Sequence, residues 1–227
     1  MNEWQTIRES LDNSGFATIQ GALTAGECSD LIAGYSNDRL YRSTIDMKRF
    51  RFGDGQYRYF NYPLPTLVER TRKTFYPELA ILANEWNGKL GIESRYPSTH
   101  EEFIAQCKDH NQRRPTPLIL RYGPGGFNTL HQDLYGDVYF PFQIVFLLTQ
   151  PGVDHEGGEF VLTEQVPRAQ SIARVVHANK GDAVIFTTNF RPVKGSKGYY
   201  RAKLKHGVSM VLSGQRYAMG VIFHDGN

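Results

Sequence analysis

The stretch Leu118–Asp133, with the sequence LILRYGPGGFNTLHQD, carries the strongest indication of the fold. Its apolar start predicts a strand, and the Gly-Pro-Gly-Gly run after Tyr122 predicts a turn into a second strand. Side chains alternate along a strand, so His131 and Asp133 would face one side and Gln132 the other. An imidazole and a carboxylate placed in this way can hold one metal ion. The same short pattern also occurs in surface loops with a solvated aspartate.

A third metal ligand must come from a later strand, and four histidines follow Asp133. We expect His155 in a solvated loop, His177 at a strand end and His224 in the core near the C-terminus. His206 is the preferred ligand, because it opens an apolar run that predicts a strand. Two histidines and one carboxylate leave three coordination positions open. This is the arrangement of non-haem Fe(II) oxygenases, and the open positions suit a bidentate 2-oxoacid together with O2.

Arg216 follows His206 closely, and Ser213-Gly214-Gln215 predicts a hairpin turn between them. The hairpin would place both residues on adjacent strands of one core. Small residues alternate after Arg216 and leave space on its face, and a buried arginine needs an anion. The distal carboxylate of 2-oxoglutarate would satisfy it bidentately, with the Tyr122 hydroxyl as a second donor. The alternatives are a surface arginine on a strand and a core tyrosine.

Short strands dominate the chain after Pro115. Apolar or alternating runs predict strands over 118–122, 143–148, 158–162, 173–176, 182–186, 208–212 and 216–223. Many short strands at this spacing favour a sandwich or a barrel. The second half of the chain is therefore expected to form a β-core.

Helices are predicted before Pro115. A capping box at Thr24–Glu27 begins a helix that reaches about Tyr35. A longer helix begins after Pro65 and is expected to kink or divide at Pro77, which lacks an amide donor. A further helix is expected over 101–109. The fold class is thus mainly β with flanking N-terminal helices.

Composition excludes several classes of protein. The chain has 227 residues, of which 40% are hydrophobic and 22% charged, so it can bury a core and is not disordered. No apolar run is long enough to span a membrane. Met1 to Trp4 lack the basic region that opens a secretory signal, so a cytoplasmic location is expected. Cys28 and Cys107 match no zinc pattern and are expected to be reduced thiols.

A segment rich in cations and aromatics could contact an anionic substrate. Lys48–Phe60 is predicted to form a hairpin with a Gly-Asp-Gly turn, and its candidate substrate contacts are Arg49, Arg51, Tyr57 and Tyr59. Cations can hold phosphate while aromatic rings stack on bases. A mobile aromatic lid would also help an enzyme that extrudes a base from a duplex. The alternative is an edge hairpin that buries its aromatics and solvates its cations.

A second basic segment, Arg191–Lys205, contains no acidic residue and runs up to His206. It could steer a phosphate backbone toward the metal, with Arg201 as its candidate contact. A solvated basic loop is the alternative.

The order and spacing of His131-Gln132-Asp133, Gly157-Gly158-Glu159-Phe160, His206 and Arg216 resemble those of the 2-oxoglutarate/Fe(II) dioxygenase superfamily, in its prolyl-4-hydroxylase-like branch. The resemblance implies a double-stranded β-helix (jelly roll), with residues 1–115 as helical support and substrate lid and 116–227 as the jelly-roll core of one domain, 1–227. It also implies that His131, Asp133 and His206 hold the catalytic Fe(II). The cosubstrates would be 2-oxoglutarate and O2, and the products succinate, CO2 and a hydroxylated substrate.

A narrower resemblance concerns four strings: Tyr41–Met47 (YRSTIDM), His131–Asp137 (HQDLYGD), Gly158–Gln165 (GEFVLTEQ) and Gly198–Arg201 (GYYR). They look like a bacterial oxygenase family described as acting oxidatively on alkyl-damaged DNA, which implies removal of alkyl groups and a nucleic-acid partner. Two other hypotheses stay open. One is a hydroxylase of protein side chains or of a small acidic metabolite, and the other is a jelly-roll metal-binding module without catalysis.

Overall fold

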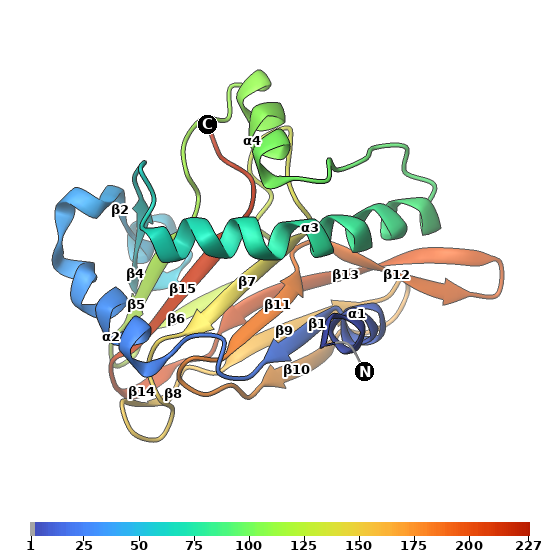
Figure 1. Cartoon of the computed structure of the whole chain (residues 1–227). Helices are drawn as coiled ribbons and strands as arrows, with labels where there is room; N and C mark the ends of the chain where they lie inside the picture. Colours follow the sequence, from blue (N-terminus) through green and yellow to red (C-terminus); the bar gives the residue numbers. More distant parts are fainter. Residues whose placement is uncertain (1–2) are drawn as a thin grey trace.

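Strands from both halves of the chain build two antiparallel sheets that pack face to face (Figure 1). The computed structural model describes residues 3–227; Met1 and Asn2, which belong to the segment considered as an export signal, lie outside this range. The larger sheet has seven strands, in the order β1 (Phe16–Ile19), β11 (Ala183–Thr187), β7 (Phe142–Leu147), β15 (Arg216–Ile222), β5 (Leu118–Tyr122), β4 (Gln56–Phe60) and β2 (Tyr41–Asp46).

The smaller sheet faces the larger one across the core. It has six strands: β10 (Ile172–Val176), β9 (Phe160–Gln165), β13 (Gly198–Val208), β6 (Phe127–His131) and β3 (Gly53–Asp54) in order, with β12 (Phe190–Gly195) paired to β13. A short pair, β8 (His155–Gly157) and β14 (Val211–Gly214), closes one end. Apolar side chains from both sheets, such as Phe160 and Phe186, meet between them. This is the predicted double-stranded β-helix, mainly β with flanking helices.

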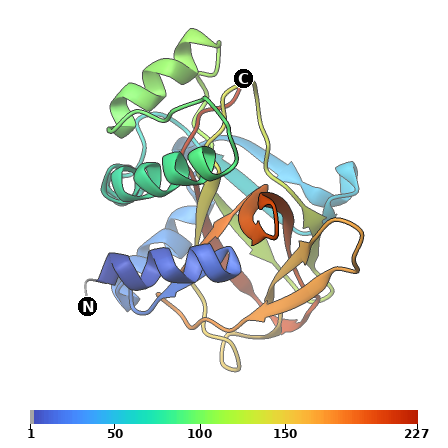
Figure 2. The same cartoon turned by 90° about the vertical axis from the view of Figure 1, so that its right-hand side faces the viewer.

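Helices cover the outer face of the larger sheet (Figures 1 and 2). They are α1 (Glu3–Ser14), α2 (Ala25–Ala33) and α3 (Thr66–Lys89), while α4 (His100–Asp109) packs against α3. Short 3-10 turns lie at Gly34–Ser36, Asp38–Leu40 and Met47–Phe50. The capping box at Thr24 is present as predicted, and Thr99 forms a second one. Helix α3 crosses the sheet, and Trp86 packs on Phe142 with ring centroids 4.8 Å apart. The helices thus leave the space between the sheets free for a site.

Helix α3 corrects one expectation. Pro77 does not divide it, since the helix continues through this residue to Lys89. Side chains on both sides of Pro77, including Tyr76 and Leu79, are buried, so packing of the whole length onto the core outweighs the one backbone hydrogen bond that proline removes. No helix within residues 3–227 is long and apolar enough to cross a membrane. Cys28 and Cys107 are both free and buried.

The predicted hairpin over Lys48–Phe60 is wrong. Strand β3 joins the smaller sheet by pairing with β6, whereas β4 lies in the larger sheet between β2 and β5. The segment therefore passes from one sheet to the other. By contrast, the basic segment read as a possible loop, Arg191–Lys205, forms the β12–β13 hairpin, which projects beyond the body of the fold in Figure 1.

Candidate metal centre

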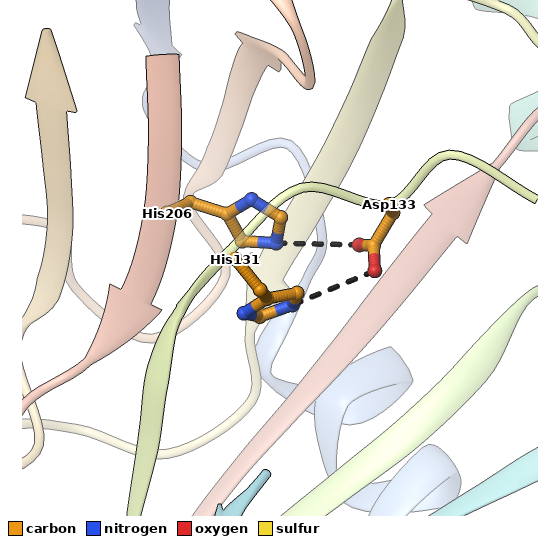
Figure 3. Close-up of side chains that lie close together, drawn as sticks. All are labelled: His131, Asp133 and His206. Carbon is orange, nitrogen blue, oxygen red and sulfur yellow. Dashed lines mark ion pairs between the residues drawn. The ribbon is translucent and has the colours of Figure 1, made fainter. Parts of the chain in front are cut away.

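Neighbouring strands bring the three candidate ligands together. His131 ends β6 and pairs in register with His206 of β13, so both imidazoles leave the same face of the smaller sheet. Asp133 lies two residues beyond β6, in the loop that leaves the strand rather than on the strand as predicted. The two rings point at its carboxylate, as Figure 3 shows. One donor atom from each residue lies within 4.8 Å of the others, which is the size of a site for one metal ion.

The Asp133 carboxylate contacts both histidines. His131 Nε2 lies 3.5 Å from one oxygen and His206 Nε2 lies 3.3 Å from the other. Burial of Asp133 would raise its pKa, but hydrogen bonds and charge interactions with the two histidines hold that pKa well below its usual range. The residue therefore offers an anion in a buried position, which is costly unless a cation shares the site.

Contacts outside the triad orient its donor atoms. The Nδ1 of His131 donates to the Thr129 carbonyl at 2.7 Å, which leaves Nε2 with the lone pair that a metal needs. The two oxygens of Asp133 accept hydrogen bonds from the Tyr135 hydroxyl at 2.6 Å and from Gln143 Nε2 at 2.9 Å. These partners fix the direction in which the carboxylate faces the histidines.

His206 is held in an apolar setting. Its ring packs on Phe186 with centroids 4.7 Å apart, and the Phe160 ring centroid lies 6.0 Å away. Burial lowers the pKa of His206, so the neutral imidazole that binds metals is the favoured form. Its place differs from the prediction, because His206 lies near the end of the long strand β13 and does not open the strand that follows it.

The other histidines downstream of Asp133 lie outside the triad. His177 is exposed just after β10, as predicted for a strand end. His224 is fully buried in the core, where its Nδ1 accepts a hydrogen bond from the Phe140 amide. The solvated-loop prediction for His155 is wrong: this residue is buried in β8 and its Nδ1 donates to the Gly157 carbonyl.

A cavity of about 260 Å³ opens beside the triad, between the two sheets. Arg216 lines this cavity and is 1% exposed, yet Nε and Nη2 of the guanidinium have no hydrogen-bond partner within residues 3–227. Tyr122, the register partner of Arg216 on β5, also presents a buried hydroxyl without a partner in the described chain. Burial raises the pKa of Tyr122 to about 12, so the hydroxyl keeps its proton and can donate. A buried cation with free donors calls for an anionic ligand.

The predicted hairpin that would join His206 and Arg216 does not form. The chain leaves β13 at Val208, β14 pairs with β8, and Arg216 then begins β15 in the larger sheet. His206 and Arg216 therefore belong to opposite sheets, and both line the cavity between them. The prediction that both residues serve one site does not depend on the hairpin.

The candidate substrate contacts divide into two groups. Tyr57 and Tyr59 of β4 line the cavity. Arg49 and Arg51 are exposed on the turn before β3, and Arg201 is exposed on the projecting hairpin, where its guanidinium lies 4.9 Å from the Phe190 ring centroid. None of these three arginines lines the cavity.

Two further arginines of the basic segments are buried and form ion pairs with carboxylates of the protein itself. Arg58 is buried and pairs with Asp38 at 2.5 Å. Arg191 is buried and pairs with Glu164 at 2.7 Å, while it also donates to the Asp12 carbonyl. Neither is free to meet a substrate.

Sequence reasoning missed Tyr135 and Gln143. Gln143 is the one polar residue in the apolar strand 142–147, and this break in the pattern was a signal, because a buried amide must find a partner. Tyr135 follows Asp133 by two residues in an irregular loop, and no periodicity predicts where such a side chain points.

The chain resembles known proteins in sequence and in fold. Residues 55–226 match a family described as an oxygenase catalysing oxidative methylation of damaged DNA. Two curated proteins of Mycobacterium tuberculosis, each described as uncharacterized, are 45% identical to the chain over 166 residues, which is 73% of this chain and 71% of theirs.

Solved structures share the fold. A prolyl-4-hydroxylase of Pseudomonas putida aligns with a TM-score of 0.55 and 14% identity, covering 98% of this chain and 100% of that one. A prolyl hydroxylase of Trichoplax adhaerens, solved with a fragment of the oxygen degradation domain of hypoxia inducible factor, aligns with a TM-score of 0.57 and 14% identity, covering 96% and 87%. At these identities the likeness concerns the fold alone.

Proposed function

The chain belongs to the family of oxygenases described as catalysing oxidative methylation of damaged DNA, and on that premise we propose that its substrate is an alkylated base in DNA. The chain is a 2-oxoglutarate- and Fe(II)-dependent dioxygenase that also uses O2. Membership of this family of enzymes sets aside a metal-binding module without catalysis.

We assign the iron to His131, Asp133 and His206. Their donor set, two imidazoles and one carboxylate, would hold Fe(II) and leave positions for the cosubstrates, and the buried anionic Asp133 fits a cation. Bound iron, 2-oxoglutarate and O2 would supply hydroxylation of a C–H bond, coupled to conversion of 2-oxoglutarate to succinate and CO2. The role of Tyr135 and Gln143 is to keep the carboxylate turned toward the histidines.

Arg216 and Tyr122 are assigned to the distal carboxylate of 2-oxoglutarate. The free donors of the guanidinium fit a carboxylate bidentately, and the Tyr122 hydroxyl adds a third. A diacid is the ligand class that such a site selects, because one carboxylate can meet Arg216 while the 2-oxoacid end reaches the triad in the same cavity. The assignment rests on one observation: the buried Arg216 guanidinium has donors without a partner in residues 3–227 and lines the same cavity as the triad.

The rest of the cavity suits a flat, alkylated ring. Tyr57 and Tyr59 add aromatic faces to a wall that also includes Leu120 and Phe52. Apolar walls exclude water from the carbon to be oxidised. An N-methyl group hydroxylated here would lose formaldehyde, because its N–C–OH carbon collapses to a carbonyl while the base recovers its N–H. Arg49, Arg51 and Arg201 lie outside the cavity, where a phosphate backbone would pass.

The proposal is tested by formaldehyde release. The iron- and 2-oxoglutarate-loaded enzyme is mixed with single- and double-stranded oligonucleotides that carry one N-methylated base, with Asp133→Ala as the inactive control. We expect formaldehyde and succinate in equal amounts from the wild type and neither from the variant. Succinate without formaldehyde on every oligonucleotide would remove the DNA substrate and leave the oxygenase. Succinate formation stimulated by a peptide or a small acid would then identify the alternative substrate class.

We also propose that residues 1–227 act as one domain. Strands from the first 115 residues belong to both sheets: β1, β2 and β4 extend the larger sheet, and β3 extends the smaller one. The part expected to serve as helical support therefore also supplies walls of the cavity, among them Tyr57 and Tyr59.

A further inference from the structure

Two exposed aromatic rings lie at the entrance of the cavity. Phe50 and Phe52 are 52% and 47% exposed, and their rings are stacked with centroids 5.6 Å apart and planes inclined by 18°. Phe52 also lines the cavity that contains the triad, whereas Phe50 does not. The pair therefore leads from the solvent to the cavity, with Phe50 on the outside. Rings of this size gain free energy when they are covered, so leaving both half exposed has a cost.

The fold holds this aromatic pair firmly. The side chain of Asp46 caps the turn Met47–Phe50 by accepting a hydrogen bond from the Lys48 amide at 3.0 Å. The Phe52 amide donates to the Met47 carbonyl at 3.1 Å. The Phe52 carbonyl accepts from both the amide and the hydroxyl of Thr129, at 2.9 and 2.8 Å. Because Met47 is fully buried and Thr129 belongs to the strand of His131, the pair is anchored to the strand that carries a metal ligand. A fixed platform fits these contacts better than the mobile lid expected from the sequence.

Cations flank the pair. Arg49 and Arg51 are exposed, and neither forms an ion pair with any residue from 3 to 227. Lys48 differs, because its ammonium pairs with Asp54 at 3.2 Å. The segment thus offers two exposed guanidinium groups, on residues that alternate in sequence with the two stacked rings. Rings that stack on bases next to cations that meet phosphates form the arrangement that binds single-stranded nucleic acid without reading its sequence.

We propose that Phe50 and Phe52 form a stacking platform for the base next to the one being oxidised, on a single-stranded stretch of nucleic acid. This inference rests on the proposed function and adds the form of the substrate. Since Phe52 covers one face of Phe50, the outer face of Phe50 is the one that receives the neighbouring base. A base in a duplex is already stacked on both faces, so it gains little from the platform, and single strands are preferred.

Binding of an oligonucleotide tests the platform. A labelled single strand with one N-methylated base, and its duplex, are titrated anaerobically with the enzyme loaded with Fe(II) and 2-oxoglutarate, and binding is followed by fluorescence anisotropy. For the single strand we expect Phe50→Ala to bind on the order of 10-fold more weakly than the wild type. Phe50→Trp should bind at least as tightly, because it restores a ring. Ile81→Ala is the matched control, since Ile81 is 48% exposed on α3, on the helical side of the fold.

The outcomes separate the platform from the function on which it rests. A Phe50→Ala variant that binds the single strand as tightly as Ile81→Ala would overturn the platform, even if the wild type releases formaldehyde from DNA. Equal weakening on single strand and duplex would overturn the preference for single strands. A wild type that neither binds nor oxidises any oligonucleotide would overturn the proposed function, and the platform with it.

Discussion

Gly158 lies directly against the buried side chain of Arg216: a β-carbon at position 158 would stand 2.7 Å from Arg216 Cδ. The backbone of Gly158 is also left-handed, with φ +71°. The absence of a side chain at Gly158, the second glycine of the Gly-Gly-Glu-Phe string, thus leaves the space that the Arg216 side chain occupies in the cavity wall. This contact joins β15 of the larger sheet to the end of the smaller one.

Gly158→Ala should therefore weaken 2-oxoglutarate binding by about 10-fold or more, because Arg216 must shift away from its present position. It should also cost about 1–2 kcal/mol of unfolding free energy from left-handed strain. The affinity is measured by titrating 2-oxoglutarate into the iron-loaded protein under anaerobic conditions. Gly152→Ala is the matched control, since Gly152 has φ +77° and nothing within 4 Å of its added β-carbon. An equal loss of affinity in both variants would contradict the role of the contact.

Arg216→Ala should weaken 2-oxoglutarate binding by about 30-fold or more and leave iron binding near normal, because it removes the cation that meets the distal carboxylate. Equilibrium dialysis of Fe(II) and of 2-oxoglutarate separates the two effects. Arg121→Ala serves as the control, since Arg121 precedes Tyr122 on the same strand but does not line the cavity. Loss of iron with normal cosubstrate affinity would refute the assignment.

Gln143→Leu should lower iron affinity by about 10- to 100-fold while the fold persists. The substitution keeps the side-chain volume but removes the donor to Asp133 at 2.9 Å. Competition with a metal-indicator dye measures the affinity, and a thermal melt of the metal-free protein checks the fold. Gln150→Leu, at a position away from the triad, should bind iron like the wild type. If Gln143→Leu also did, Gln143 would not orient the carboxylate.

Stability should fall as the pH drops from 6.5 toward 3, because two buried histidines resist protonation. Burial lowers the pKa of His100 and of His224 to about 3, while each would titrate near 6.5 in the unfolded chain. In this window the unfolded chain binds more protons, so acid favours unfolding. Each residue should remove about 1–2 kcal/mol between pH 7.5 and pH 5.

Urea unfolding of the metal-free protein at both pH values tests this expectation. His100→Gln keeps a donor for the Phe223 carbonyl but cannot titrate, so its stability should depend less on pH than that of the wild type. His177→Gln, at an exposed position, should leave the pH dependence unchanged. A pH dependence that is the same in His100→Gln and the wild type would show that His100 does not contribute.

The sequence predicted residue identities better than their connections. The triad and Arg216 were found because metal ligands and buried cations are chemically unusual residues in strands. The positions of His206 and Arg216 in the sheets were not predicted correctly. Their short separation in the sequence favours a hairpin, whereas the chain passes from β13 through β14 to the opposite sheet. Strand β14 pairs with β8 on the way, and β8 lies more than 50 residues earlier in the chain, so local sequence does not encode this pairing.

The clusters of basic residues in the sequence predicted exposed cationic segments, but they did not show which arginines are buried in ion pairs. Arg58 and Arg191 belong to the basic segments, yet each is buried against a carboxylate that is remote in sequence, Asp38 or Glu164. Their ion pairs depend on the tertiary fold. Arg49 and Arg51 have the same local character and stay exposed.

A crystal structure grown anaerobically with Mn(II) in place of Fe(II) and with 2-oxoglutarate tests the central assignment most directly. We expect one metal ion bound by His131 Nε2, an Asp133 oxygen and His206 Nε2, with the distal carboxylate of the diacid on Arg216 and Tyr122. A metal bound without one of these three ligands, or a diacid whose distal carboxylate lies away from Arg216, would contradict the account.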